Sequence, residues 1–515
     1  MNKKINSLFS LLIAGLVLVS CSNEKKETTA GSTTNSDSAK IYVRKNANSP
    51  EAKADLEAMN IALQKMRAMD CSNPASWYYQ GSIHWLPDTI KNNQLCASYS
   101  NMSQLKLAWD NCTHADGEDS DFNFLIWHRF YILHFEDIVR ELSGYKDFAL
   151  PYWDYTDTTD LKLNRTMPLP VRTSGNSLFE QSRFDSLNQG YMISGQPITD
   201  ALDITELMQK SYYEDFNNTI NQAPHGAMHN YIGAGNYGQM MWNPIYQDSV
   251  DSEGNVLGGL MANVPSAGYD PIFWMHHSNI DRLWQQWMNM DQSHLVDSAK
   301  VVAHPWPYTF FNAKGDTIQY TMEQVAAQMY KMNYRYTGLG TPLLASANKS
   351  TVQSAKLAPA TTDTIQTMKV AKKINIQNKS LVHSISLKPE KTEMLRKIQS
   401  DVAKKTKLKV TVSFKKEPKN AYQVYLNLPK GVAPNVKSVY FVGFMNFFGA
   451  THHASHSKEN KIANGLVQKT FYFDVSDEVK DAKVIDQKAL NISIFLSGGN
   501  KEEGITVESF TLYSN

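Results

Sequence analysis

One run of fifteen residues constrains the fold of this chain more than any other part of its sequence. It reads Asp-Pro-Ile-Phe-Trp-Met-His-His-Ser-Asn-Ile-Asp-Arg-Leu-Trp and spans residues 270–284. His277 lies one helical turn before Asp281 in an otherwise apolar and aromatic frame, so a buried helix here would carry an imidazole into the core. Residues 127–136 and 225–229 also contain histidines within helical patterns. We therefore expect three segments to converge on one buried, nitrogen-rich site.

The pair His225 and His229 has the spacing of a metal site. Histidines four residues apart lie on one face of a helix, where both imidazoles can reach a single ion. Such a pair also occurs on protein surfaces and in packed cores, and a third ligand must come from another segment. Imidazole nitrogens without carboxylates suit copper better than calcium or magnesium, and zinc is also chemically compatible.

At these residues the chain resembles the tyrosinase and polyphenol oxidase family, whose members hold a coupled pair of copper ions. The family pattern Asp-Pro-x-Phe-aromatic-x-x-His-x-x-x-Asp falls on residues 270–281. The resemblance implies that His277 joins His225 and His229 on one copper, with His276 as a packed or hydrogen-bonded neighbour. A second family pattern falls on residues 124–136 and implies the ligands of the other copper, which are His84, His114 and His128.

Two features qualify the second ligand set. His134 lies six residues after His128, about 240° further around a helix, so we do not expect it to share their ion. His114 and His128 are 14 residues apart, a longer span than the family usually has. A polar insertion at residues 116–121, which we expect to form a loop, explains the additional residues between the two histidines.

The cysteines agree with this reading. Cys112 stands two residues before His114, and the resemblance implies a thioether bond that fixes the orientation of the ligand ring. If Cys21 carries a lipid, as its surroundings predict below, three cysteines remain, Cys71, Cys96 and Cys112. An odd number predicts one disulfide bond and one cysteine outside it. A Cys96–Cys112 disulfide with Cys71 free is the alternative, and both connectivities stay open here.

The N-terminus resembles a bacterial lipoprotein signal. Lys3 and Lys4 precede an apolar run at residues 8–19 that is too short to remain as a membrane span, and Cys21 follows. The resemblance implies a signal peptide at residues 1–20 and a lipid on Cys21. The lipid would anchor the protein outside the cytoplasm, and we expect an outer membrane as the anchoring membrane. An ordinary signal peptide with an incidental Cys21 is the alternative. Residues 21–47 are polar and predict a flexible tether.

Periodicity divides the rest of the chain into two domains. Helical patterns predict a mainly α domain at residues 48–340, and the resemblance implies a four-helix bundle that holds the copper pair. Residues 341–370 lack periodicity and predict a linker. From residue 371 to 515 the period is two, which predicts an all-β sandwich. Its expected strands are residues 408–414, 422–428, 439–444, 470–475, 491–496 and 505–513.

The expected activity is that of a copper oxidoreductase that converts o-diphenols to o-quinones with O2. In the family, a glutamate before the first histidine of one copper site and an asparagine after it hold a water that takes a monophenol's proton. Asn221 and Gly226 stand at these positions and neither can play that part. Glu214 or Asp215 would allow weak monophenol hydroxylation if their loop folded back. The alternative function is reversible O2 binding without turnover, as in haemocyanins.

Three further expectations concern access and partners. Val264 stands where plant polyphenol oxidases carry a bulky gate residue, so it would widen the entrance or simply pack. The layout resembles those plant enzymes, which implies that the C-terminal domain covers the copper entrance until the linker is cut. The histidines at 452, 453 and 456 are expected to lie in a solvated loop, and the alternative is that they bind copper. With 51 Lys and Arg against 50 Asp and Glu, nothing favours a nucleic-acid partner.

Overall fold

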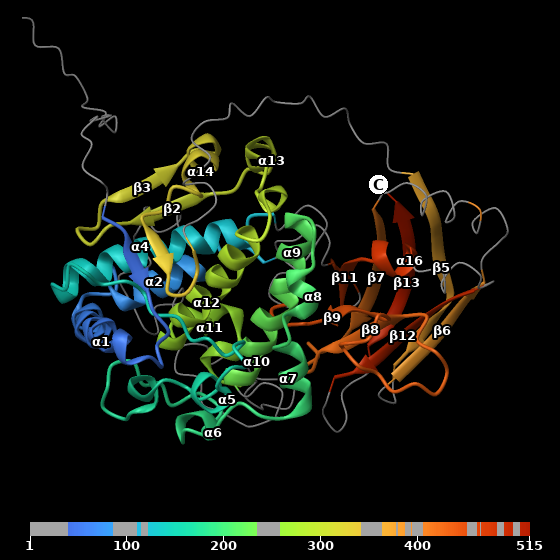
Figure 1. Ribbon diagram of the computed structural model, residues 1–515, viewed down its shortest axis with the longest axis horizontal. Coiled ribbons are helices and arrows are strands. Elements are labelled where there is room, and N and C mark those ends of the chain that lie inside the picture. The colour runs from blue at the N-terminus through green and yellow to red at the C-terminus, as the bar shows by residue number, and fades with distance from the viewer. Residues whose placement is uncertain are drawn as a thin grey trace, which may run out of the picture. The chain divides into compact units, whose positions relative to one another are not determined.

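The computed structural model describes most of the chain beyond residue 39. The described residues are 40–85, 111–114, 122–233, 258–340, 363–376, 380–386, 393, 405–450, 461–463, 465–480, 489–497 and 505–514. Residues 41–515 form one compact unit. It contains a helical domain followed by a β domain, as the ribbon colours blue to yellow and orange to red distinguish in Figure 1.

Two long helices pack together in the helical domain, α4 (Phe124–Ser143) and α12 (Pro271–Met288). Asp270 caps the start of α12 by accepting a hydrogen bond from Ile272 N, and a proline at the first helical position reinforces that start. Gly144 ends α4 in the left-handed conformation, with φ 78°. Helix α1 (Lys53–Ala68) packs on α4, and α2 (Trp77–His84) follows α1. The predicted mainly α class of this domain and the helical pattern at residues 127–136 are confirmed.

Shorter elements surround these helices. They are η1 (Pro50–Ala52), α5 (Leu161–Asn164), η4 (Leu169–Arg172), α6 (Asp185–Asn188), α7 (Gln196–Ala201), α8 (Thr205–Met208), α9 (Tyr213–Ile220), the π-helical turn η5 (Asn221–Gly226), α10 (Ala227–Ile232), η7 (Leu260–Ala262), α11 (Val264–Ala267), η8 (Gln292–His294), α13 (Ser298–Ala303) and α14 (Met322–Gln328). Two small sheets pair β1 (Tyr42–Arg44) with β4 (Tyr334–Tyr336) and β2 (Tyr308–Phe311) with β3 (Thr317–Tyr320).

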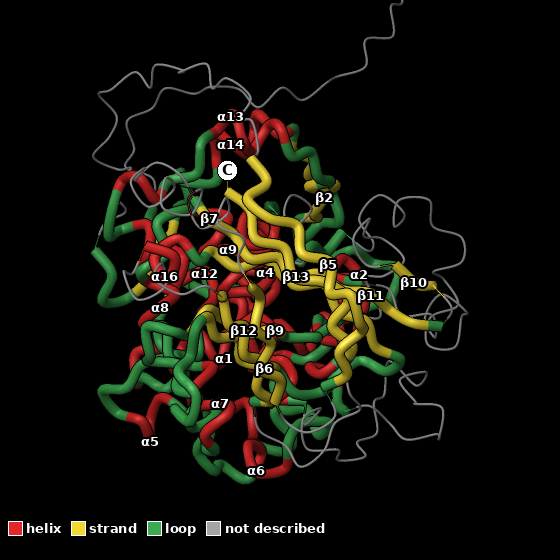
Figure 2. Tube along the Cα trace, turned by 90° about the vertical axis from the view of Figure 1, so that its right-hand side faces the viewer, coloured by secondary structure: helices red, strands yellow, loops and turns green. Residues whose placement is uncertain are grey.

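The β domain consists of two sheets around a common apolar core, which confirms the predicted all-β class. One sheet has the order β10-β11-β7-β13-β5 and the other β6-β12-β8-β9. Figure 2 shows β13 beside β5 and β12 beside β6. The described strands are β5 (Asp363–Asn375), β6 (Ser380–Ser386), β7 (Thr406–Phe414), β8 (Tyr422–Leu426), β9 (Phe441–Met445), β10 (Lys461–Ala463), β11 (Leu466–Asp474), β12 (Ala489–Leu496) and β13 (Thr506–Ser514), and the short helix α16 (Ser476–Lys480) follows β11.

Two predicted boundaries are wrong. Strand β1 lies inside the predicted tether at residues 21–47, and its Arg44 is fully buried. Strand β5 begins at Asp363, inside the predicted linker at residues 341–370. Both segments have a polar composition, and each becomes a strand by pairing with a distant partner, β4 in one case and β13 in the other.

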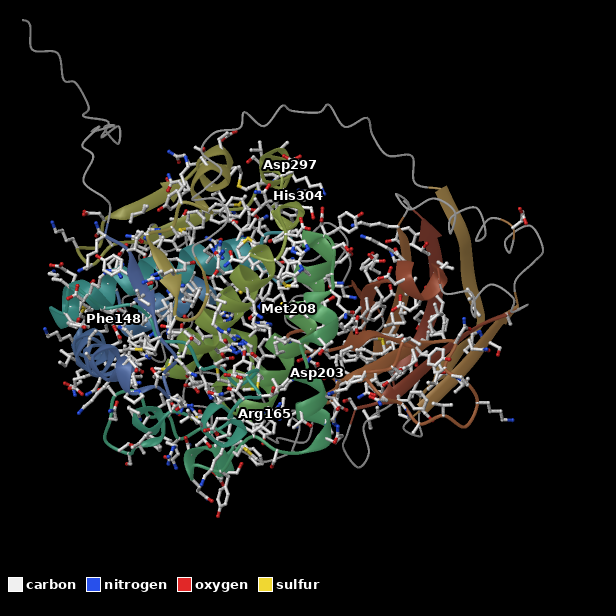
Figure 3. The ribbon with its side chains drawn as sticks, viewed as in Figure 1. Phe148, Arg165, Asp203, Met208, Asp297 and His304 are labelled. Carbon is white, nitrogen blue, oxygen red and sulfur yellow. The ribbon has the colours of Figure 1, made fainter. Side chains whose placement is uncertain are left out.

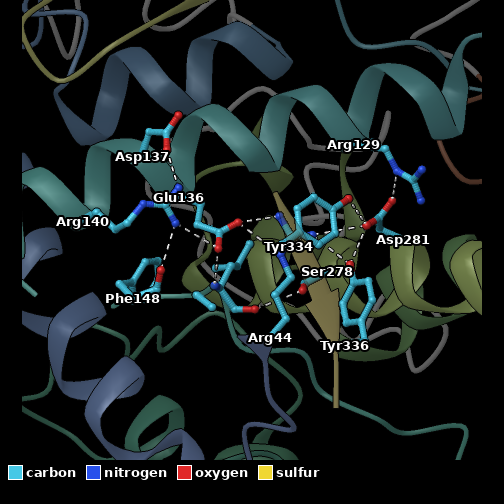
Figure 4. Close-up of polar contacts among 12 residues, drawn as sticks. Arg44, Arg129, Glu136, Asp137, Arg140, Phe148, Ser278, Asp281, Tyr334 and Tyr336 are labelled. Carbon is cyan, nitrogen blue, oxygen red and sulfur yellow. Dashed lines mark hydrogen bonds and ion pairs between the residues drawn. The ribbon is translucent and has the colours of Figure 1, made fainter. Parts of the chain in front are cut away.

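A buried charge network ties the first and last strands of the helical domain to its two long helices (Figure 4). The Arg44 guanidinium lies 2.5 Å from Glu136 on α4 and 3.2 Å from Asp281 on α12. Arg129 Nε donates to Asp281 at 2.6 Å, and the Tyr336 hydroxyl donates to the same carboxylate at 2.5 Å. Burial alone would raise the pKa of Asp281, but Arg129 and Arg44 hold it below its usual value.

The two domains share a polar contact surface. Lys437 of the β domain pairs with Asp203 at 3.2 Å, and Figure 3 labels Asp203 among the side chains of the helical domain. Asn218 donates to the Tyr472 carbonyl at 2.7 Å, and Lys405 pairs with Asp215 at 3.3 Å. Within the described ranges, the structure has no helix with the length and apolar character needed to cross a bilayer.

Candidate metal centre

Six histidines from separate segments meet in the interior of the helical domain, and each side chain is at most 3% exposed. One segment contributes the last residue of α2, and another is the short described stretch at residues 111–114. The remaining segments are α4, the η5–α10 pair and α12. In chain order the six are His84, His114, His128, His225, His229 and His277.

The first group contains the three histidines predicted for one copper. The ring centres of His225 and His229 are 4.6 Å apart, and His277 lies 5.1 Å from the first and 5.8 Å from the second. One nitrogen of each of these residues, together with one of His276, lies within 4.8 Å of the others. Three helical segments therefore direct their imidazoles toward one point.

Backbone carbonyls fix which nitrogen of each ring faces that point. His225 Nδ1 donates to Asn221 O at 3.2 Å, and His229 Nδ1 donates to Met261 O at 3.0 Å. Nε2 of each ring is thereby left as the lone-pair nitrogen. Among the described residues, neither Nε2 has a hydrogen-bond partner, and neither nitrogen of His277 has one. Buried nitrogens without partners are costly, and a metal ion would satisfy them.

The second group contains the ligands predicted for the other copper. The ring centres of His84, His114 and His128 are 5.8 to 6.2 Å apart. His128 Nδ1 donates to Phe124 O at 2.8 Å, which again leaves Nε2 free of backbone bonding. Nitrogens of His84 and His114 lie within 4.8 Å of each other and of the Cys112 sulfur. His84, His114 and Cys112 thus have the geometry of an ion site, and the His128 ring adjoins them.

Cys112 lies among these imidazoles. Its Sγ atom is 3.0 Å from His84 Nε2 and 3.5 Å from His128 Nε2. Cys71 is disulfide-bonded and Cys112 is not, so the alternative with a Cys96–Cys112 disulfide is wrong. The thioether between Cys112 and His114 stays a prediction.

The two groups adjoin each other. The rings of His128 and His277 stack at 4.2 Å with an interplanar angle of 5°. His114 and His225 come within 5.6 Å from the two sides. Two ions held by these groups would therefore be neighbours, as a small diatomic molecule bridging them requires.

Burial keeps the imidazoles in their ligand form. It lowers the pKa of His128 and of His229 to about 3. Burial, followed by the charges of neighbouring histidines, lowers the pKa of His225 and His277 well below the usual value. The rings are neutral at physiological pH, and neutral imidazole is the form that binds metal. Six nitrogen donors without a carboxylate fit copper.

Other sequence candidates lie outside this centre or beside it. His134 Nε2 contacts the Tyr320 hydroxyl at 3.0 Å. His276 Nδ1 is 2.7 Å from the Tyr155 hydroxyl, which fits the predicted hydrogen-bonded neighbour. Val264 is completely buried in α11, and its place at the entrance stays a prediction. The histidines at 452, 453 and 456, like Cys21, lie outside the described residues.

The two carboxylates considered as substitute bases are engaged elsewhere. Glu214 pairs with Lys300 at 2.5 Å. Asp215 pairs with Lys405 of the β domain at 3.3 Å. Both residues belong to the first turn of α9, and their pairing with lysines leaves neither as a free base for a monophenol's proton.

Phe448 is the site residue that sequence reasoning missed. It follows β9 in the β domain, and its ring stacks on His229 at 4.3 Å with an interplanar angle of 22°. It also lies 5.9 Å from the ring of His114 and 6.1 Å from that of His225. One aromatic side chain thus lies over both groups of histidines. The run Asn446-Phe447-Phe448-Gly449 was the only available signal, and it does not say which phenylalanine leaves the β core.

Known proteins match both domains. Residues 74–200 and 176–290 match the family described as the common central domain of tyrosinase, and residues 364–515 match a domain of unknown function. A tyrosinase of Hahella sp. (strain CCB-MM4) is 24% identical over 447 residues, which cover 82% of this chain and 88% of the relative. Polyphenol oxidase B of Solanum lycopersicum is 22% identical over 489 residues, with 87% and 73% covered.

Solved structures share the fold across both domains. Latent apple tyrosinase has a TM-score of 0.59 at 17% identity, over 92% of this chain and 97% of that chain. Latent aurone synthase, a polyphenol oxidase, has a TM-score of 0.60 at 16% identity, over 93% and 90%.

Proposed function

Because the chain belongs to the tyrosinase and polyphenol oxidase family, we propose that it oxidises o-diphenols to o-quinones. Family membership makes the protein a phenol-oxidising enzyme, and the preference for o-diphenols is the part proposed here. Two diphenols and one O2 give two o-quinones and two waters, so each diphenol loses two electrons and two protons. The observation that carries the proposal is the meeting of two adjoining histidine groups beneath one aromatic side chain.

The histidines divide into two ligand sets. His84, His114 and His128 would hold one copper ion, and His225, His229 and His277 the other. Bound there, the copper pair would supply the redox couple between diphenol and O2. The protein's own contribution is positional: backbone carbonyls orient three of the rings, and burial keeps them neutral.

The residues around His225 support a preference for diphenols. Gly226 has no side chain to orient a water, and Asn221 accepts a proton poorly compared with a carboxylate. The nearest acidic residues on the preceding helix are paired with lysines. A monophenol must lose its proton before it is hydroxylated, whereas an o-diphenol only has to be oxidised. A site without a positioned base therefore favours the second reaction.

Substrate range tests this proposal directly. We expect the copper-loaded full chain to form quinone from 4-tert-butylcatechol and not from tyrosine or an o-aminophenol, measured by quinone absorbance and O2 consumption. Hydroxylation of tyrosine at a comparable rate would contradict the diphenol preference. Reversible O2 uptake without quinone would instead identify an oxygen carrier.

We propose further that the β domain keeps the enzyme latent through Phe448. The ring covers the histidines that a substrate must approach, so only chains with this ring displaced can react. Replacing Phe448 with alanine removes the stacking on His229 and leaves the rest of the loop in place. A substrate binds only the fraction of chains in which this ring is displaced, so the apparent affinity falls with that fraction. A buried aromatic contact stabilises the closed form by about 1.5–3 kcal/mol. Its removal should therefore raise kcat/KM about tenfold or more.

Phe447 offers the matched control for this variant. Its ring lies in the β core against Phe414, Tyr422 and Phe471 and points away from the histidines. We expect Phe447→Leu to retain the low activity of the full chain, while Phe448→Ala is activated without proteolysis. Equal activity of the wild-type and Phe448→Ala chains would contradict latency at this residue.

We also propose that the protein is lipid-anchored in the cell envelope through Cys21. The support is the apolar run at residues 8–19 followed by Ser20 and Cys21. Mass spectrometry of the mature N-terminus would find a diacylated cysteine at position 21, whereas an unmodified terminus at another residue would contradict the anchor.

A further inference from the structure

Asn446 of the β domain fills a hollow beside the first histidine of the η5–α10 pair. A side chain at Gly226 would have its Cβ atom 3.2 Å from the carboxamide carbon and nitrogen of Asn446. Contact that close is tighter than ordinary packing, so the hollow exists because residue 226 is glycine. Asn446 is only 4% exposed. The hollow therefore holds a buried carboxamide next to His225.

The contacts of Asn446 show what this hollow binds. Its backbone N–H donates to Gln222 Oε1 at 2.9 Å, and its Nδ2 donates to the Gln222 carbonyl at 3.1 Å. Asn230 Nδ2 donates to its Oδ1 at 3.5 Å. For the carboxamide itself the hollow thus offers one acceptor, the Gln222 carbonyl, and one donor, Asn230 Nδ2, which are the complement of an amide group. Gln222 Oε1 holds the backbone of residue 446 instead. All three partner groups are uncharged.

The same segment also presents an aromatic ring to the metal centre. The Phe448 N–H donates to Asn446 Oδ1 at 2.9 Å, and the Phe448 ring stacks on His229. One short stretch of chain therefore places a ring over the histidines and an amide in the hollow at the same time. A substrate that displaces Phe448 finds the hollow within reach of its own ring substituent.

Building on the proposed function, we infer that Gln222, Gly226 and Asn230 form a substrate subsite that selects o-diphenols with an uncharged amide on the side chain. Such phenols include N-acylated catecholamines and dihydroxyphenylalanyl residues within peptides. An ammonium or carboxylate in this place would lose its hydration and meet only neutral partners, which is unfavourable for a charge. An amide recovers the hydrogen bonds that Asn446 now makes.

The test uses the copper-loaded full chain carrying Asn446→Gly and Phe448→Ala, which empties the hollow and uncovers the histidines. Substrates are N-acetyldopamine, dopamine and 4-methylcatechol. We expect kcat/KM for N-acetyldopamine to exceed that for dopamine by about tenfold or more, because an unpaired buried charge costs more than an unmade neutral hydrogen bond. Adding Asn230→Leu, which removes the donor to the amide oxygen, should lower this ratio severalfold through KM. Gln319→Leu, an exposed glutamine on β3, is the matched control and should leave the ratio unchanged.

A second measurement does not depend on turnover. In the copper-free wild-type chain, 3-phenylpropanamide should compete with the Asn446–Phe448 segment and speed hydrogen exchange at residues 445–450, while 3-phenylpropylamine should not. Equal effects of amide and amine, in exchange and in kcat/KM, would overturn the subsite. Failure of the double variant to oxidise 4-methylcatechol would overturn the proposed function, which is a separate outcome.

Discussion

Replacing His277 with alanine should abolish catechol oxidation and lower the copper content of the loaded chain from two ions to one. His277 is the contact between the two histidine groups, since its ring stacks on His128 at 4.2 Å. Within the described residues, neither of its nitrogens has a protein partner. Loss of this imidazole leaves two ligands on one ion, too few to hold copper against solvent. Metal analysis and quinone formation measure the two effects.

His134 is the matched control for His277. It is also a buried histidine on a long helix, but its Nε2 contacts the Tyr320 hydroxyl. We expect His134→Ala to retain both copper ions and the oxidase activity. Full copper content in His277→Ala would contradict the ligand assignment, and a loss of copper in His276→Ala would then identify the neighbouring imidazole as the ligand.

Replacing Arg44 with methionine should lower the free energy of unfolding by about 3 to 5 kcal/mol. The change keeps an apolar side chain of similar length but leaves Glu136 and Asp281 with one cation fewer in a fully buried network. Removing one partner of a buried ion pair has a cost of that size, because the remaining charge is uncompensated. Urea unfolding of the full chain, followed by tryptophan fluorescence, measures it.

An exposed ion pair provides the comparison. Lys146 pairs with Glu141 at 2.7 Å, and both side chains are more than half exposed. We expect Lys146→Met to change the free energy of unfolding by less than about 1 kcal/mol. If Arg44→Met proved as mild as Lys146→Met, the network would not be what holds β1 and β4 onto the long helices.

Sequence patterns predicted the helices and strands whose formation depends on neighbouring residues. Helical periodicity predicted α4, and alternation predicted β7, β8, β9, β11, β12 and β13 near their observed bounds. The run at residues 270–281 carries a capping aspartate, a proline at the first helical position and His277 within one helix. Such features are properties of a few neighbouring residues, so a sequence displays them directly.

Long-range contacts account for what the sequence did not reveal. Arg44 looks like part of a polar tether until its guanidinium meets Glu136, 92 residues away. Phe448 resembles any β-domain aromatic until it stacks on His229. Strand β5 is recognised by its pairing with β13, because its own composition is rich in Thr and Lys. In each case the partner lies far along the chain, and no local spacing encodes it.

The close fit between Gly226 and Asn446 constrains how this lineage can evolve. A side chain gained at position 226, the position that can host a water-holding asparagine, would bring its Cβ atom to 3.2 Å from the carboxamide of Asn446, which would then have to shift by a few tenths of an ångström. The effect of a substitution at position 226 therefore depends on the residue at position 446. We expect the two positions to be epistatic, and a shift toward monophenols to loosen the seat of the covering loop.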